Sequence, residues 1–187
     1  MGLIFSLRIA LLGEYNILFK AAKNGNEHFI KLLLDREGTQ VKKKGNSALL
    51  WASHNGHDRV VKLLLEKEYI NVNFACEDGF TPLIWAARYG HVKVVEVLLG
   101  KEDIEVNKTK NSGSAPLHAA AYYGHNKVVK LLLKQEGIQI NEANHFGFTP
   151  ISLAAEKRHS KIVDMLLGTD KIRADGWAGW RPNADPA

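Results

Sequence analysis

The sequence repeats itself at an interval of 34 residues, and this interval restricts the fold more than any other feature. Glycines recur at that spacing as Gly45, Gly79, Gly113 and Gly147. Each of these units continues with small residues and then with an apolar cluster, such as the segment 94–99. A unit of this length cannot bury its own apolar side chains, so it must stack on its neighbours. The sequence therefore predicts an elongated array of similar units.

The third unit shows what each repeat is expected to form. Thr81 is a good N-cap, and Pro82 suits the first position of a helix. Gly90 can adopt the left-handed conformation that ends this helix. The apolar residues of 94–99 then lie on one face of a second helix. Both helices are shorter than isolated helices that are stable in water, so their stability must come from stacking.

These residues resemble the ankyrin repeat, whose signature is Thr-Pro-Leu-His-x-Ala. The best matches are the segments 81–87, 116–120 and 149–155, and the resemblance extends over residues 14–168. It implies an all-α repeat solenoid of about five stacked helix-turn-helix units with β-hairpin-like loops. The expected units are 14–44, 45–78, 79–112, 113–146 and 147–168.

The first unit is shorter than the others, and its missing residues fall after Val41. We therefore expect a short hairpin tip there, with the lysines of 42–44 in a solvated loop. Residues 169–187 form a tail, in which the segment 179–182 is similar to the start of an aborted sixth unit. The fifth unit keeps the apolar pattern of an internal repeat, whereas terminal repeats normally have a polar outer face. We expect a monomer unless this uncovered unit associates with a second copy.

The apolar segment 1–13 permits two interpretations. Gly2 and Ser6 fit the Met-Gly-x-x-x-Ser pattern of N-myristoylation, and an acylated Gly2 would give weak membrane attachment. Alternatively, the apolar side chains form a helix that caps the first repeat, which is the interpretation we favour.

No motif for catalysis or for a cofactor is found in the sequence. It has no phosphate-binding glycine loop, no nucleophile elbow and no His-Glu-x-x-His. The single cysteine, Cys76, excludes an intramolecular disulfide and a multi-cysteine zinc site. We therefore predict no enzyme activity, no catalytic residue, no cofactor, no metal and no small-molecule substrate.

Other recurring polar residues are predicted to be structural. His57, His91, His125 and His159 occupy the same position in successive units, too far apart to share one metal ion, so we expect a repeated hydrogen bond. His118 occupies the histidine position of the signature. Asparagines at 73, 107 and 141 are expected to cap their own hairpins.

The net charge of +5 is spread along the chain, which makes nucleic acid an improbable partner. One unpaired thiol fits a reducing compartment, so we expect a cytoplasmic protein, with the nucleus as the alternative.

The resemblance implies that the function is binding of another protein through the concave face of the array. In the family, the contact-making positions flank the first glycine of a unit and precede the second. By register these are Lys43, Lys44, Asn46, His54, Asn55, Glu77, Asp78, Phe80, Arg88, Tyr89, Asn111, Ser112, Ser114, Tyr122, Tyr123, His145, Phe146, Phe148, Glu156 and Lys157.

Aromatic residues and arginine are the usual energetic anchors of protein interfaces, and this set contains both. We expect Tyr89, Tyr122 and Tyr123 to form a contiguous aromatic strip. Trp51 and Trp85 occupy positions that are buried in the family, so they are assigned to the core. Two alternatives to a free-standing binding module are a regulatory or targeting part of a larger enzyme or receptor chain, and a membrane-tethered adaptor acylated at Gly2.

Overall fold

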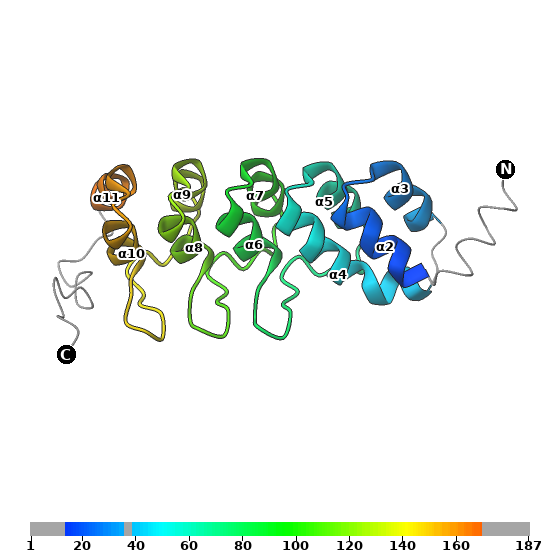
Figure 1. Ribbon diagram of the computed structural model, residues 1–187, viewed down its shortest axis with the longest axis horizontal. Coiled ribbons are helices and arrows are strands. Elements are labelled where there is room, and N and C mark those ends of the chain that lie inside the picture. The colour runs from blue at the N-terminus through cyan, green and yellow to red at the C-terminus, as the bar shows by residue number, and fades with distance from the viewer. Residues whose placement is uncertain (1–13, 36–38, 170–187) are drawn as a thin grey trace, which may run out of the picture.

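The computed structural model describes residues 14–35 and 39–169, and ten helices lie in these ranges. In chain order they are α2 (Glu14–Lys23), α3 (Glu27–Asp35), α4 (Thr39–Asn55), α5 (Asp58–Leu65), α6 (Pro82–Tyr89), α7 (Val92–Leu99), α8 (Pro116–Tyr122), α9 (Asn126–Leu133), α10 (Pro150–Glu156) and α11 (Ser160–Leu167). The even-numbered helices form one row and the odd-numbered helices a second row along the array (Figure 1). The predicted all-α repeat solenoid is confirmed.

The apolar core runs continuously through both rows, because equivalent side chains of successive units are buried against one another. The even-numbered helices contribute Leu49, Leu83, Leu117 and Ile151, and the odd-numbered helices contribute Leu64, Leu98, Leu132 and Leu166. Fully buried alanines at positions 52, 86, 120 and 154 allow the even-numbered helices to pack closely. No unit holds its core alone, as the short period predicts.

The helix ends follow the sequence signals. Thr81 Oγ1 accepts a hydrogen bond from the Ile84 backbone N–H at 3.2 Å, and Gly90 ends α6 with a φ of 70°. The fourth unit lacks this cap, because Ala115 occupies the N-cap position of α8. In the fifth unit, Arg158 adopts a φ of 59°, a conformation that favours glycine.

A histidine of each later unit is hydrogen-bonded to the unit before it. The Nε2–H groups of His57, His91, His125 and His159 donate to the backbone carbonyls of residues 23, 54, 88 and 122 at 2.9–3.1 Å. The rings lie against the glycines of the preceding unit: a Cβ on Gly90 would be only 2.5 Å from Nδ1 of His125. The prediction of a repeated structural hydrogen bond is confirmed.

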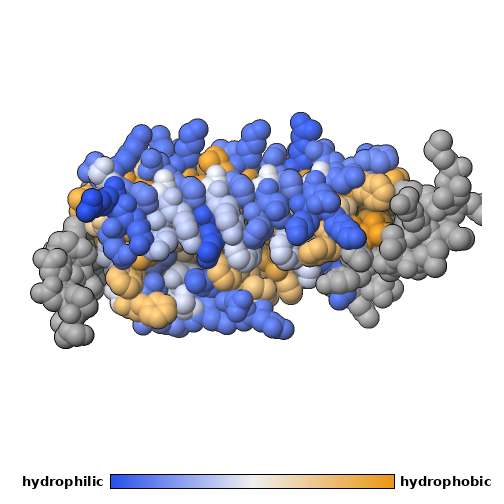
Figure 2. All heavy atoms as spheres, in the orientation of Figure 1, coloured by the Kyte–Doolittle hydropathy of each residue, from blue (hydrophilic) through white to orange (hydrophobic). Residues whose placement is uncertain are grey.

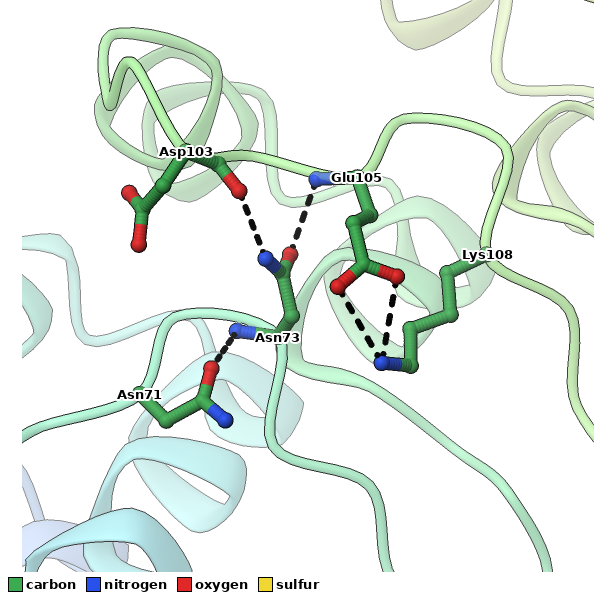
Figure 3. A network of polar contacts seen from close by, with 5 residues as sticks. All are labelled: Asn71, Asn73, Asp103, Glu105 and Lys108. Atoms are coloured by element: carbon green, nitrogen blue, oxygen red, sulfur yellow. Dashed lines mark hydrogen bonds and ion pairs between the residues drawn. The ribbon is translucent and has the colours of Figure 1, made fainter.

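Two of the recurring asparagines, Asn73 and Asn107, also connect units, which differs from the prediction that they cap hairpins. Asn73 Nδ2 donates to the Asp103 carbonyl at 2.6 Å, and its Oδ1 accepts from the Glu105 N–H at 2.9 Å (Figure 3). Asn107 makes the same two bonds one unit later, to the backbone of 137 and 139. The sequence spacing fixed the positions of these amides but could not show that their partners lie in the next repeat.

Three loops fold back on themselves before α6, α8 and α10, and in Figure 1 they project to the same side of the array. The N–H groups of Cys76, Lys110 and Asn144 donate to the carbonyls of residues 80, 114 and 148. These loops are hairpin-like, but no residue in the described ranges is assigned to a strand. We call them hairpins 1, 2 and 3, comprising residues 74–81, 108–115 and 142–149.

The first junction differs from the prediction, because the described residues 39–55 form a helix where a short hairpin tip was expected. Residues 39–55 are one continuous helix, α4, so the backbone of the tri-lysine 42–44 is helical and does not form a loop. Gly45 lies inside this helix, and a Cβ there would clash with Ile70 Cδ1. This glycine therefore lies at a close helix contact and not in a turn.

Residues 1–13 and 170–187 lie outside the described ranges, as do the predictions that concern Gly2, the N-terminal capping helix and the aborted sixth unit. None of the described helices combines the length and the apolar character that a bilayer-spanning segment requires.

Candidate protein interface

Hairpins 1–3 and helices α6, α8 and α10 together form one surface, which we call the hairpin face. It contains a cleft of about 390 Å³. The cleft is lined by Phe80, Ile84, Arg88, Lys110, Ser112, Ser114, His118, Ala119, Tyr122, Tyr123, Asn144, Phe146, Phe148, Leu153 and Glu156. In Figure 2 a group of apolar residues lies at the C-terminal end of the lower edge, most of which is otherwise lined by hydrophilic residues, and hydrophilic residues also cover much of the odd-numbered helices above.

An aromatic cluster lies at the side of the cleft toward the N-terminus. The rings of Phe80 and Trp85 are stacked at a centroid distance of 4.1 Å, and Tyr89 stacks on Trp85 at 5.9 Å. His54 contacts both Trp85 and Tyr89, at 4.8 and 4.6 Å. Hairpin 1 thus packs Phe80 onto α6, and Tyr89 stays exposed.

The assignment of Trp51 and Trp85 to the core was wrong. Both side chains are half-buried and contact other rings: Trp51 lies edge-on to Phe19 at 5.1 Å, and His54 lies between the two tryptophans. The core positions of α4 and α6 are taken by leucine and alanine on the adjacent helix face. The indoles therefore form part of the surface next to the cleft.

The tyrosines share one face, but the expected contiguous aromatic strip is interrupted, because the Arg88 guanidinium lies between Tyr89 and Tyr123. Tyr89 and Tyr123 are equivalent residues of α6 and the α8 end, and 44% and 41% of their respective areas are exposed. The Arg88 guanidinium carbon lies 5.9 Å from the Tyr89 ring centroid and 5.0 Å from that of Tyr123. Tyr122 is half-buried and contacts Tyr123 at 4.9 Å.

The charged residues in and beside the cleft differ in whether they have partners. Lys157 forms an ion pair with Glu156 at 2.8 Å and lies over the Tyr122 ring, and the hydrogen bond with Glu156 raises the pKa of the lysine. Arg88 and Lys110 instead lie over the Phe80 ring, at 5.9 and 5.0 Å.

Burial affects the two histidines near the cleft. His118 is only 2% exposed, and burial lowers its pKa to about 4, although the nearby carbonyls of Glu142 and Phe148 oppose the shift. Its Nδ1 accepts from the Ala115 N–H at 3.2 Å, as expected for a structural residue. Burial also lowers the pKa of His54, against the opposing hydrogen bond with Asn55.

Several of the predicted contact residues make bonds within the array. Asn46 Oδ1 accepts from the Asn71 N–H, Asn55 donates to the Trp51 carbonyl, and Asn111 joins hairpin 2 to the Glu77 carbonyl of hairpin 1. Asn46 and Asn111 thus hold neighbouring segments together, whereas the Asn55 bond lies within α4.

The other predicted residues away from the cleft lie near the loop ends or in α4. Glu77, Asp78 and His145 are exposed on hairpins 1 and 3, and the backbones of Lys43 and Lys44 lie in α4, far in sequence from any hairpin.

The sequence analysis missed several residues of the cleft, chiefly Lys110, Asn144, Ile84 and Leu153. Lys110 and Asn144 are 34 residues apart and occupy equivalent positions in hairpins 2 and 3. This shared register is the signal that could have identified them. Ile84 and Leu153 are buried residues whose edges reach the cleft floor, which the apolar pattern cannot distinguish from ordinary core residues.

Within residues 14–35 and 39–169, no three His, Cys, Asp or Glu side chains are grouped so that they could hold a metal ion. A comparison with curated proteins found no match. The family model for ankyrin repeats (three copies) matches residues 18–110 and, in a second overlapping match, residues 101–175. Together with the stacked helix pairs and the hairpins between them, this match shows that the chain belongs to the ankyrin repeat family.

Proposed function

We propose that this chain binds a partner protein through the hairpin face, with the cleft as the centre of the contact. Ankyrin repeats are in general protein–protein interaction modules and are typically non-enzymatic. The observation that carries the proposal is the exposure of large aromatic side chains around one cleft. Phe146 is 72% exposed, and Tyr89 and Tyr123 are also exposed.

The distribution of exposed apolar residues supports this face over the others. Five large apolar side chains are exposed in the described part of the chain, and three of them are these aromatic residues. The other two, Leu32 and Leu167, lie on α3 and α11 at opposite ends of the array. Aromatic side chains in well-packed surroundings supply much of the binding energy of protein interfaces.

Site-specific photo-crosslinking tests which face is used. A benzoyl-phenylalanine at position 123 reports on the hairpin face, and the same group at Lys130, an exposed residue of α9, reports on the opposite row. We expect a partner to cross-link from position 123 only and to be identified by mass spectrometry. Cross-linking from position 130 alone would place the interface on the odd-numbered helices and refute the proposal.

The purified partner then allows a calorimetric test. Tyr89→Ala/Tyr123→Ala should weaken binding by about 2 kcal/mol or more for each ring. The unfolding midpoint should change little, because both rings are exposed. A double variant that unfolds early but binds normally while folded would show that the rings serve packing alone.

A further inference from the structure

Two cations of the cleft lack an acidic partner. In the part of the chain that the structure describes, no carboxylate forms an ion pair with Arg88 or Lys110. Arg88 Nε is buried and has no hydrogen-bond acceptor. The guanidinium carbon lies within 6 Å of the ring centroids of Phe80, Trp85, Tyr89 and Tyr123, so it is partly shielded from water.

Two oxygen acceptors of the cleft, Asn144 Oδ1 and Ser114 Oγ, already accept hydrogen bonds within the array. Asn144 Oδ1 accepts from the N–H groups of Phe146 and Phe148 at 3.0 and 3.1 Å. Ser114 Oγ accepts from Asn144 Nδ2 at 3.1 Å, and from Ser112 Oγ at 3.3 Å. The lining holds two cations, Arg88 and Lys110, against one carboxylate, Glu156, which is paired with Lys157, so a ligand acceptor would meet two cations without an ion-pair partner.

We infer that the cleft binds an extended peptide segment of the partner that carries a carboxylate side chain next to an apolar residue. This inference rests on the proposed function and names the chemistry of the partner. A carboxylate would pair with Arg88 and Lys110 through charge-assisted hydrogen bonds. The neighbouring apolar residue would pack on the rings of Tyr123 and Phe146, which line the same cleft.

The arrangement of the cations favours one carboxylate over a nucleic-acid strand. Strands are bound by positive charges that follow the phosphate backbone, usually with aromatic residues for successive bases. Here Arg88 and Lys110 converge on a single ring, that of Phe80, and the next cation of the cleft edge, Lys157, is neutralised by Glu156. This geometry suits one compact anion beside an apolar surface.

A random dodecapeptide library displayed on phage provides the probe, selected against the full chain. We expect the enriched sequences to share an aspartate or glutamate adjacent to an apolar residue. Synthetic copies are then titrated by fluorescence anisotropy. Arg88→Met and Lys110→Met should each weaken binding at least about tenfold, as expected for loss of one member of a close charge pair. Lys127→Met, which removes the same charge from an exposed position on α9, should leave affinity unchanged.

A second variant keeps the test independent of how the protein variants fold. Changing the peptide carboxylate to its amide should weaken binding to the wild-type protein by the same factor as Arg88→Met does. The amide peptide should bind the Arg88→Met protein little more weakly than the carboxylate peptide does, because the two changes remove one interaction.

Several results would overturn the inference. Enriched peptides without acidic residues that still depend on Tyr123 would refute the carboxylate and leave the proposed function standing. Peptides that are insensitive to both Arg88→Met and Tyr123→Ala would refute both. A selection that enriches no sequence would refute the inference that the cleft binds a short peptide segment. A twelve-nucleotide single strand that binds more tightly than the peptides and depends on Arg88 would replace the peptide by nucleic acid.

Discussion

The missing cap of α8 makes Ala115→Thr a sharp test of the repeat's local physics. Ala115 has φ −81° and ψ 170°, close to the −91° and 164° of Thr81, so a threonine needs no backbone change. In α6 and α10 the threonine hydroxyl accepts from the N–H three residues on, at 3.2 and 3.3 Å. In α8 the corresponding N–H belongs to His118 and has no side-chain acceptor. An N-cap threonine in place of alanine contributes about 0.5–2 kcal/mol.

Urea denaturation followed by circular dichroism measures this gain. With a slope of about 1–3 kcal/mol per molar, a gain of 1 kcal/mol raises the midpoint by roughly 0.3–1 M. Ala115→Val is the matched control, because valine has the shape of threonine without the hydroxyl. We expect the urea midpoint of Ala115→Thr to exceed that of Ala115→Val by the shift that corresponds to the whole capping contribution, and we expect the slope to stay unchanged. Equal midpoints for the two variants would show that no hydrogen bond forms and would refute the reasoning.

Three further predictions concern single residues of the array. Arg158→Gly should stabilise the protein by about 1 kcal/mol by relieving the positive φ, and Arg158→Ala should not; equal midpoints for both would contradict strain at this turn. The His118 pKa is about 4 in the folded chain and 6.5 when unfolded, so the unfolded state binds more protons between these values. Stability should therefore be complete above pH 6.5 and fall by up to about 3 kcal/mol toward pH 4, a loss that urea midpoints of His118→Gln should lack. Asn73→Ala should cost about 1–2 kcal/mol and speed hydrogen exchange at the Glu105 amide, whereas an unchanged exchange rate would show that the inter-unit bond is dispensable.

The sequence predicted those parts of the fold that depend on one repeat or on strict register. The cap at Thr81, the turn at Gly90 and the histidine bonds between units all follow from residue type and spacing. The continuous α4 did not follow, because a deletion in a loop can either shorten a hairpin or remove it. In the helix that forms, Gly45 packs against Ile70, which lies 25 residues away, and a contact of this kind cannot be read from the local sequence.

The candidate site was predicted in part, because side chains of two or three units meet there. Register placed Tyr89, Tyr123 and Phe146 on one face, since equivalent positions of stacked units are adjacent. It could not show that Arg88 reaches across to the next repeat, or that Trp85 is covered by Phe80 and not by the core. The contacts of long side chains depend on how the neighbouring backbones stack, and a linear sequence pattern does not contain this information.

The paired attachments between units have a mechanical consequence. At the junction between the third unit and the unit before it, His91 binds beside the helix ends while Asn73 binds at the loop after the second helix. Two hydrogen-bonded contacts at separate points restrain both bending and twisting of one unit against the next, whereas a single contact would let the units rotate about it. A pulling force on the chain ends should therefore stretch the array elastically until one of these contacts breaks, and only then should a whole repeat detach. At the two junctions that have both contacts, those of Asn73 and Asn107, one imidazole and one amide would add this resistance to the packing of the apolar core.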